Sequence, residues 1–189
     1  MSSSKEKWIE AGEKLLRLVG IREHQKVLDF GCGSGNYTLP AARIVGRSGL
    51  VYALDKDKKV LNELMHKAES MGMKNIFRID VLKDSEIPLD NESIDVVLLF
   101  DVLHFYYFPE EDSRKHLLRD IQRILKPGAI LLLCPTHLQS YMEPKLEQVK
   151  REISRANFAF ECEYSETLII HDRNLEENKV ICFRKKANK

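Results

Sequence analysis

Two hydrophobic periodicities alternate along the chain, one typical of helices and one typical of buried strands. In the segment 8–19, apolar residues recur at helical spacing and predict an amphipathic helix. Short, mostly apolar runs then predict strands over 26–30, 50–54, 76–79, 94–100 and 129–134. Amphipathic segments between and after these runs predict helices over 36–45, 58–71, 111–125 and 146–153. The alternation indicates right-handed crossovers and a parallel sheet with helices on both faces.

The end of the chain departs from this alternation. The runs Phe158–Ile170 and Lys179–Arg184 flank the polar segment Asp172–Asn178 and predict an antiparallel hairpin. This hairpin places the last strand antiparallel to the others. We therefore expect an α/β fold in a single domain over residues 1–189, with an N-terminal helix within 1–20 as a candidate lid over the site.

The composition narrows the classes of function. A length of 189 residues corresponds to one domain. The sequence has 30 Lys and Arg residues and 29 Asp and Glu residues, which gives a formal net charge of +1. Because there is no basic excess, we expect no dedicated binder of nucleic acid or of anionic membranes. The apolar runs are too short to span a bilayer, and the first residues do not resemble a signal peptide. We predict no membrane span and a cytoplasmic protein.

Four cysteines without C-x-x-C spacing argue against a zinc ribbon or a redox motif. Cys134, Cys162 and Cys182 lie in apolar, strand-like runs. Buried thiols in a reducing compartment are the favoured interpretation. A thiol trio that binds a soft metalloid substrate is the less favoured one.

Candidate chemistry gathers at the loop after the first predicted strand. In an open parallel sheet, ligands bind beyond the carboxyl ends of the strands, and glycines there allow a close approach. Gly31, Gly33 and Gly35 form G-x-G-x-G, which is one residue too short for the dinucleotide fingerprint G-x-G-x-x-G. Asp55 ends the second strand, where a carboxylate can accept hydrogen bonds from ribose hydroxyls. This loop and carboxylate predict a nucleoside-containing ligand.

A further carboxylate, Asp80, follows the third strand, where it can accept a hydrogen bond from an adenine amine with the Val81 N–H near a ring nitrogen.

The segment Val27–Gly35, VLDFGCGSG, resembles the first motif of class I S-adenosylmethionine-dependent methyltransferases. Ile94–Asp101 resembles the fourth motif of that family, and Leu125–Gly128 resembles the fifth. Within the family, the chain looks most like small-molecule methyltransferases of the ubiquinone/menaquinone-biosynthesis type.

The resemblance implies a Rossmann-like, doubly wound, seven-stranded sheet, mostly parallel with a C-terminal antiparallel hairpin and helices on both faces. It also implies roles for the first loop, with S-adenosyl-L-methionine as the cofactor. Asp29 would lie below the loop and orient backbone groups, although a simple cap of the loop is the alternative. Gly31, Gly33 and Gly35 would line the methionine and the ribose. Tyr37, at the start of the next helix, is a candidate to close over the site.

The same resemblance implies roles for residues after the later strands. Asp55 would hold the ribose, with Lys56 beside the adenine. Asp80 and Val81 would bind the adenine, the alternative for Asp80 being a helix cap or an Asx turn. Asp101 would face the methionine amino group or the mouth of the substrate site, unless it caps the next segment.

Methyl transfer from a sulfonium is an in-line displacement, in which positioning supplies much of the acceleration. An acceptor that carries a proton also needs a base, and His104 and His137 are the candidates because they follow the fourth and fifth strands. The aromatic loop His104–Pro109 would form an apolar substrate wall or a cation cage, or would pack as core. A lid would be small, built from the N-terminal helix, the aromatic loop and Thr136–Pro144.

Several alternatives stay open. We expect no metal, because Asp101 has no second acid partner within 135–137. A small-molecule acceptor is favoured over a protein or RNA acceptor bound at an open face. A cofactor-binding module without activity is the third hypothesis. A homodimer is compatible with each of them.

Overall fold

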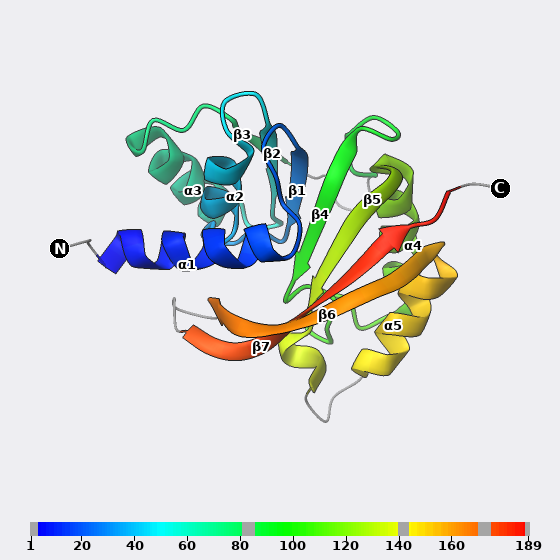
Figure 1. Ribbon diagram of the computed structural model, residues 1–189. Coiled ribbons are helices and arrows are strands. Elements are labelled where there is room, and N and C mark those ends of the chain that lie inside the picture. Colours follow the sequence, from blue (N-terminus) through cyan, green and yellow to red (C-terminus); the bar gives the residue numbers. More distant parts are fainter. Residues whose placement is uncertain (1–3, 81–85, 140–143, 170–174, 188–189) are drawn as a thin grey trace.

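A twisted sheet runs through the molecule (Figure 1). The computed structural model describes residues 4–80, 86–139, 144–169 and 175–187, and within them seven strands follow the order β3-β2-β1-β4-β5-β7-β6. The strands are β1 (Lys26–Phe30), β2 (Leu50–Leu54), β3 (Ile76–Ile79), β4 (Ile94–Phe100), β5 (Leu125–Cys134), β6 (Phe158–Ile169) and β7 (Leu175–Lys185). The neighbours from β3 to β5 are parallel, and β7 is antiparallel to both β5 and β6. The predicted fold class is confirmed.

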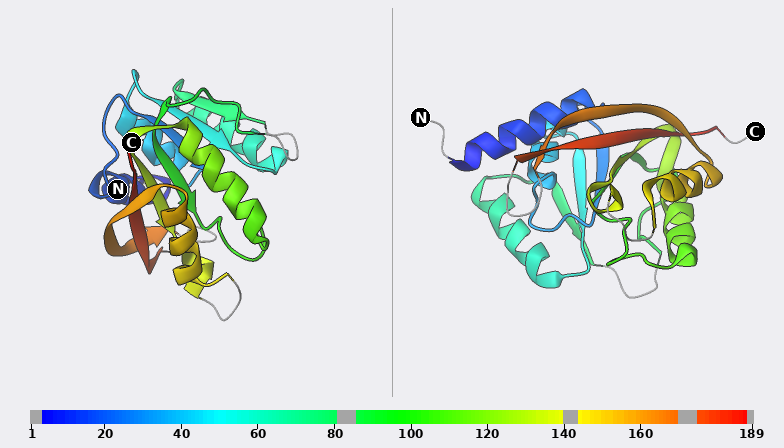
Figure 2. Two further views of the ribbon diagram at one scale, coloured as in Figure 1. Left: turned by 90° about the vertical axis from the view of Figure 1, so that its right-hand side faces the viewer. Right: turned by 90° about the horizontal axis from the view of Figure 1, so that it is seen from below.

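Helices cover both faces of the sheet, as Figure 2 shows. They are α1 (Ser4–Leu18), α2 (Thr38–Val45), α3 (Lys58–Ser70), α4 (Glu111–Ile124), α5 (Leu146–Arg155) and the short 3-10 helix η1 (Thr136–Gln139). Side chains of β4 alternate between two hydrophobic clusters, as the pleat of a strand requires. Val96 and Leu98 pack in the cluster with α1, α2 and α3, whereas Val97 and Leu99 pack in the cluster with α4 and α5. Burial on both faces explains the continuous apolar run of this strand.

The N-terminal helix α1 lies against the protein with its apolar stripe inward. All five apolar positions that predict it are buried: Trp8, Ile9, Leu15, Leu16 and Val19. The helix contacts α2 and β6. It begins at Ser4, four residues before the predicted start. Its apolar face therefore belongs to the core, and its use as a lid stays a prediction.

Strand β5 begins at Leu125, whereas the sequence predicts it from Ala129. The pairing with β4 shifts register, because Ile94 pairs with Leu125 but Val96 pairs with Ile130. An irregularity of this kind accommodates Pro127, which has no N–H to donate to a ladder. The Lys-Pro-Gly segment is therefore the bulged start of a strand and not a loop that closes helix α4.

The hairpin of β6 and β7 projects past the carboxyl edge of the sheet. Pairing between β5 and β7 ends at Leu133 with Ile181, and the antiparallel direction places earlier residues of β7 beyond β5. Asn178 lies in this projection, and its Nδ2 donates a hydrogen bond of 3.2 Å to Oγ1 of Thr136. The sequence predicts the last strand only from Lys179, four residues too late, because residues 175–178 of the predicted turn belong to β7. Residues 172–174 of that turn lie outside the described part of the chain.

Candidate functional site

The candidate residues share one edge of the sheet because each follows the carboxyl end of a parallel strand. The chain reverses its winding between β1 and β4, which are neighbours in the sheet although β2 and β3 lie between them in sequence. Ligands bind at such switch points. The loops after β1 and β4 flank this point, and those after β2, β3 and β5 lie beside them.

The glycine loop turns sharply at the end of β1. The N–H groups of Gly31 and Cys32 both donate to the carbonyl oxygen of Leu54, at 2.8 and 3.0 Å, and tie the loop to β2. Gly31, Gly33 and Gly35 all have positive φ, at 77°, 50° and 86°, a region that favours glycine. All three glycines are therefore required by the backbone conformation of the loop.

The surroundings of the three glycines differ. A Cβ at Gly31 would lie 2.7 Å from Cγ2 of Val102, and one at Gly35 would overlap the side chain of Leu64. A Cβ at Gly33 would meet no protein atom within 4 Å. Gly31 and Gly35 therefore serve close packing, whereas Gly33 presents open backbone to a ligand.

Asp55 is held against this loop. Its Oδ2 accepts the Gly33 N–H at 2.8 Å, and its Oδ1 accepts the Asp57 N–H at 2.9 Å. Asp57 in turn caps α3, since its side chain accepts the Lys59 N–H at 2.8 Å. A carboxylate has about four lone-pair sites, so the half-buried Asp55 retains acceptor capacity for ribose hydroxyls.

Asp29 lies buried near the end of β1, with 3% of its surface exposed. Oγ1 of Thr38, the first residue of α2, donates a hydrogen bond of 2.6 Å to its carboxylate. Burial raises the pKa of Asp29 to about 7, the charge of Asp55 adds to this rise, and the Thr38 hydrogen bond opposes it. Asp29 thus ties β1 to α2 below the loop, and its role toward a ligand stays a prediction.

Asp80 follows β3 and forms a two-bond pair with Arg78. Nε and Nη2 of Arg78 donate to its two oxygens at 2.8 and 2.5 Å, and Nη1 of the same guanidinium contacts Asn62. The hydrogen bond with Arg78 lowers the pKa of the exposed Asp80 carboxyl. An adenine amine would share this carboxylate with the guanidinium. Val81 lies outside the described residues.

Tyr37 is the N-cap residue of α2 and is 8% exposed. Its ring packs edge-on against Phe100 at the end of β4, with ring centroids 4.6 Å apart. The two rings therefore pack together beside the switch point, and both are largely buried. Whether Tyr37 also contacts the cofactor stays a prediction.

Asp101 begins the loop after β4 and has φ of 58°. Nε2 of His104 lies 3.0 Å from the carbonyl oxygen of Asp101, while Nδ1 accepts the Tyr106 N–H at 3.3 Å. Since a carbonyl only accepts, this network assigns the proton to Nε2. His104 is 4% exposed and both its nitrogens are engaged within its own loop. This geometry fits a histidine that shapes the loop better than one that takes a proton from an acceptor.

The second candidate base, His137, lies in η1 directly after β5. Its backbone position therefore belongs to the same edge of the sheet. Its side chain lies outside the described part of the structure, so its role as a base stays a prediction. Among the described residues, no group of three His, Cys, Asp or Glu side chains is arranged to hold a metal ion.

Three contacts at this edge are absent from the sequence-based predictions. Thr38 has no motif that marks it as the partner of Asp29. Nζ of Lys56 lies 4.1 Å from the ring centroid of Tyr107, which joins the loop after β2 to the loop after β4. A buried pair of Arg114 and Glu152 is bonded to the end of the aromatic loop, because Nη1 of Arg114 donates to the carbonyl oxygens of Phe108 and Pro109. The placement of Arg114 and Glu152 on the apolar stripes of two predicted helices could have signalled such a pair.

Comparison with known proteins assigns the family. The family described as a methyltransferase domain matches residues 28–133, which is more than half of the chain. The chain belongs to this methyltransferase domain family. A SAM-dependent methyltransferase from Aquifex aeolicus has the same fold, with a TM-score of 0.72 at 20% identity over 97% of this chain and 94% of that one. The resemblance read from the motifs is confirmed.

Two curated relatives have more specific names. A probable cobalt-precorrin-6B C(15)-methyltransferase (decarboxylating) from Saccharolobus solfataricus is 38% identical over 80 residues, which cover 42% of this chain and 40% of the relative. A demethylmenaquinone methyltransferase from Bacillus cereus is 25% identical over 126 residues, which cover 66% of this chain and 50% of the relative. The methyltransferase domain thus matches half or less of the length of each relative.

S-adenosylmethionine is the cofactor expected of this methyltransferase domain. The edge of the sheet fits it, because the open backbone at Gly33 lies directly beside the half-buried carboxylate of Asp55. The described helices include none that is long and apolar enough to cross a membrane.

Proposed function

We propose that this methyltransferase domain transfers a methyl group from S-adenosylmethionine to a small-molecule acceptor. The sulfonium supplies an activated methyl group and a neutral leaving group. The protein then has to align the acceptor atom with the methyl carbon and the sulfur, so positioning supplies much of the acceleration. A proton-bearing acceptor would also need a base, for which His137 is the remaining candidate.

The cofactor would lie across the switch point. Asp55 would hold the ribose hydroxyls, and the open backbone at Gly33 would approach the methionine and ribose. Asp80 would bind the adenine amine, with Lys56 beside the ring. Asp101 would face the methionine amino group or the mouth of the acceptor site.

The choice of a small-molecule acceptor rests on the exposed rings of the aromatic loop, residues 104–109. Phe105, Tyr106 and Tyr107 are 45%, 65% and 50% exposed, and they supply half of the six exposed large hydrophobic residues found in the described part of the chain. They follow the carboxyl end of β4, beside the proposed cofactor. Contiguous exposed apolar surface marks an interaction site. These rings would form an apolar wall for the acceptor, or a cage if the acceptor is cationic.

The alternative of an RNA substrate is weaker on electrostatic grounds. An RNA substrate is usually bound through a clear basic excess, and the formal charge here is only +1. A protein substrate at an open face requires no such excess and stays the second candidate. The open backbone at Gly33 beside Asp55 supports cofactor binding, and a module without activity would need only that part of the site.

Labelled methyl donor separates these hypotheses. The purified protein is incubated with methyl-labelled S-adenosylmethionine and a cell extract, and products are divided into small-molecule, protein and RNA fractions. We expect label in the small-molecule fraction, and about tenfold to a hundredfold less with Asp55→Ala at a subsaturating concentration of the methyl donor. Label in protein or RNA instead would overturn the choice of acceptor. An extract without any labelled product, together with intact cofactor binding, would favour the module without activity.

The wall itself is tested by Tyr106→Ala, with Phe160→Ala as the matched control. Both rings are highly exposed, at 65% and 56%, but Phe160 lies on β6 away from the aromatic loop. We expect Tyr106→Ala to raise KM for the labelled acceptor about tenfold, as for the loss of one buried aromatic contact, while Phe160→Ala changes it little. Equal KM values in both variants would remove the loop from the acceptor site.

Assembly and location belong to the same proposal. We infer a cytoplasmic enzyme and treat a homodimer as one way to complete the lid. Light scattering on the purified protein distinguishes the monomer of 21.9 kDa from twice that mass.

A further inference from the structure

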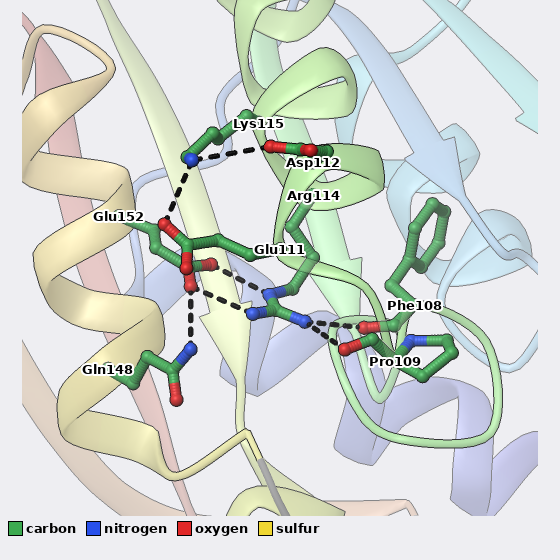
Figure 3. Close-up of polar contacts among 8 residues, drawn as sticks. All are labelled: Phe108, Pro109, Glu111, Asp112, Arg114, Lys115, Gln148 and Glu152. Atoms are coloured by element: carbon green, nitrogen blue, oxygen red, sulfur yellow. Dashed lines mark hydrogen bonds and ion pairs between the residues drawn. The ribbon is translucent and has the colours of Figure 1, made fainter.

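A buried ion pair joins α4 to α5 beside the end of the aromatic loop (Figure 3). Arg114 is 1% exposed and Glu152 is 4% exposed. Nε and Nη2 of Arg114 donate to the two carboxylate oxygens of Glu152, at 2.7 and 2.8 Å. Gln148 adds a third donor to this carboxylate, at 3.0 Å. Because taking two charges out of water is costly, such a pair is weak evidence for stability and calls for another role.

The remaining bonds of Arg114 reach the aromatic loop. Its Nη1 donates to the carbonyl oxygens of Phe108 and Pro109, each at 2.8 Å (Figure 3). Phe108 and Pro109 are the last two residues of the loop, and Arg114 lies in the first turns of the helix that follows. Two of the four hydrogen bonds of this planar guanidinium fix the direction of these carbonyls, and the other two hold it on Glu152. The single ammonium of a lysine cannot reproduce this arrangement.

The other end of the loop is held by His104. Besides its ring contacts with Asp101 and Tyr106, its carbonyl oxygen accepts the N–H groups of Tyr107 and Phe108 at 3.2 and 2.9 Å. The exposed rings therefore stand on a segment that is fixed at both ends.

The fixed loop reaches the proposed cofactor site. The ring of Tyr107 lies under Nζ of Lys56, and Lys56 is the residue after Asp55. A continuous path of contacts thus runs from Glu152 through Arg114 to the loop, and from the loop to the end of β2. Neither member of the buried pair lies at the switch point.

We propose that Arg114, oriented by Glu152, is a positioning residue that holds the aromatic loop in the conformation that receives the acceptor. This inference rests on the proposed function only in assigning the acceptor to the loop. Without the guanidinium, the two loop carbonyls lose their bonds from Arg114, and the Glu152 carboxylate loses two hydrogen bonds and keeps the one from Gln148. The loop then exchanges among conformations, and the acceptor binds a smaller competent fraction.

The test compares Arg114→Lys with Arg123→Lys, which repeats the same pattern elsewhere. Arg123 donates to Asp120 and to the carbonyl oxygens of Leu89 and Ile87, each at 2.8 Å. Those carbonyls precede β4, at the opposite edge of the sheet. If replacing any arginine that anchors backbone carbonyls loosens the protein, both variants show faster exchange and a higher acceptor KM. If Arg114 positions the aromatic loop, only Arg114→Lys shows these changes.

Three readouts are measured on each variant: S-adenosylhomocysteine affinity by calorimetry, amide hydrogen exchange, and kinetics with the acceptor found by labelling. In Arg114→Lys we expect exchange at Tyr107 and Phe108 to rise about tenfold or more, the change that one lost hydrogen bond produces. Acceptor KM rises in parallel, with affinity for S-adenosylhomocysteine nearly unchanged. Arg123→Lys leaves the exchange at these two amides and the acceptor KM unchanged.

A double variant, Arg114→Met with Glu152→Leu, separates positioning from folding. Apolar replacement of a whole buried pair often preserves stability, so this variant is expected to fold and yet show fast exchange in the aromatic loop. Unchanged exchange at Tyr107 and Phe108 in both Arg114 variants would overturn the positioning role. If the wild-type protein does not bind S-adenosylhomocysteine, the proposed function is contradicted. The exchange result on the aromatic loop remains valid in that case.

Discussion

The carboxylate of Asp55 accepts a hydrogen bond of 2.8 Å from the backbone N–H of Gly33. This bond joins the loop after β1 to the end of β2 and places a half-buried carboxylate beside open glycine backbone. A bound nucleoside needs both features. Its ribose hydroxyls donate to the carboxylate, and a bulky side chain in place of Gly33 would exclude it. The relationship explains why a glycine loop and a distant aspartate function as one site.

Replacement of Gly35 by alanine should destabilise the protein more than replacement of Gly46. Both glycines have positive φ, at 86° and 70°, but a Cβ at Gly35 overlaps the side chain of Leu64 whereas one at Gly46 meets nothing within 4 Å. Both variants bear the backbone strain, and only Gly35→Ala adds overpacking of about 1–3 kcal/mol. Urea denaturation measures the free energy of unfolding of each variant. Equal decreases in the two variants would show that Leu64 on α3 moves aside without destabilising the protein.

Asp29 should make stability depend on pH. Its pKa is about 7 in the folded protein against 3.8 for the ordinary carboxyl, so the folded state retains the proton through this interval. Stability contributed by the protonated form is therefore lost as the pH rises from about 4 to about 7, with a limiting slope of about 1.4 kcal/mol per pH unit.

Asp29→Asn tests this dependence, since its amide oxygen can still accept the Thr38 hydroxyl. We expect the wild type to lose stability relative to Asp29→Asn as the pH rises across that interval. Above the interval, the difference in the free energy of unfolding should stay constant. Denaturant titrations at several pH values measure it. A difference that does not vary with pH would mean that Asp29 titrates normally.

The four thiols should differ in reactivity. Burial raises the pKa of Cys32 far above its ordinary value, that of Cys134 to about 11 and that of Cys182 to about 12. Cys162 is half-exposed. Because the thiolate is the nucleophile, a thiol reagent at about pH 8 should label Cys162 well before the others.

Mass spectrometry of the labelled peptides locates the modified thiol. Cys162→Ser should abolish the fast phase, and all four cysteines of the wild type should react in denaturant. A fast phase that persists in Cys162→Ser would show that one of the buried thiols opens to solvent.

The sequence predicts those parts of the fold that depend on local pattern. The bounds of β1 to β4 agree with the apolar runs, because each strand is short, buried and flanked by polar or glycine residues. The start of β5 is missed because a register shift with β4, not local propensity, draws Leu125 into the sheet. The extension of β7 is missed for a related reason, since pairing with β6 extends it through polar residues beyond the apolar run.

The site divides in the same way. Motif spacing finds the glycine loop and Asp55, because one short turn and one strand end bring them together. It does not find Arg114 with Glu152, whose partnership spans two helices. A signal is present, however: Arg114 lies on the stripe of Leu117 and Leu118. Glu152 likewise adjoins Val149 and Ile153. Opposite charges on the apolar stripes of successive helices indicate a buried pair.

Calorimetric titration with S-adenosylhomocysteine tests the central claim most directly. Wild type, Asp55→Ala and Asp57→Asn are compared, the last because asparagine still caps α3. We predict micromolar binding by wild type and Asp57→Asn, and a loss of about tenfold to a hundredfold in Asp55→Ala from the lost hydrogen bonds to a charged acceptor. Wild-type protein that does not bind, or Asp55→Ala that binds equally well, would contradict the account of this site.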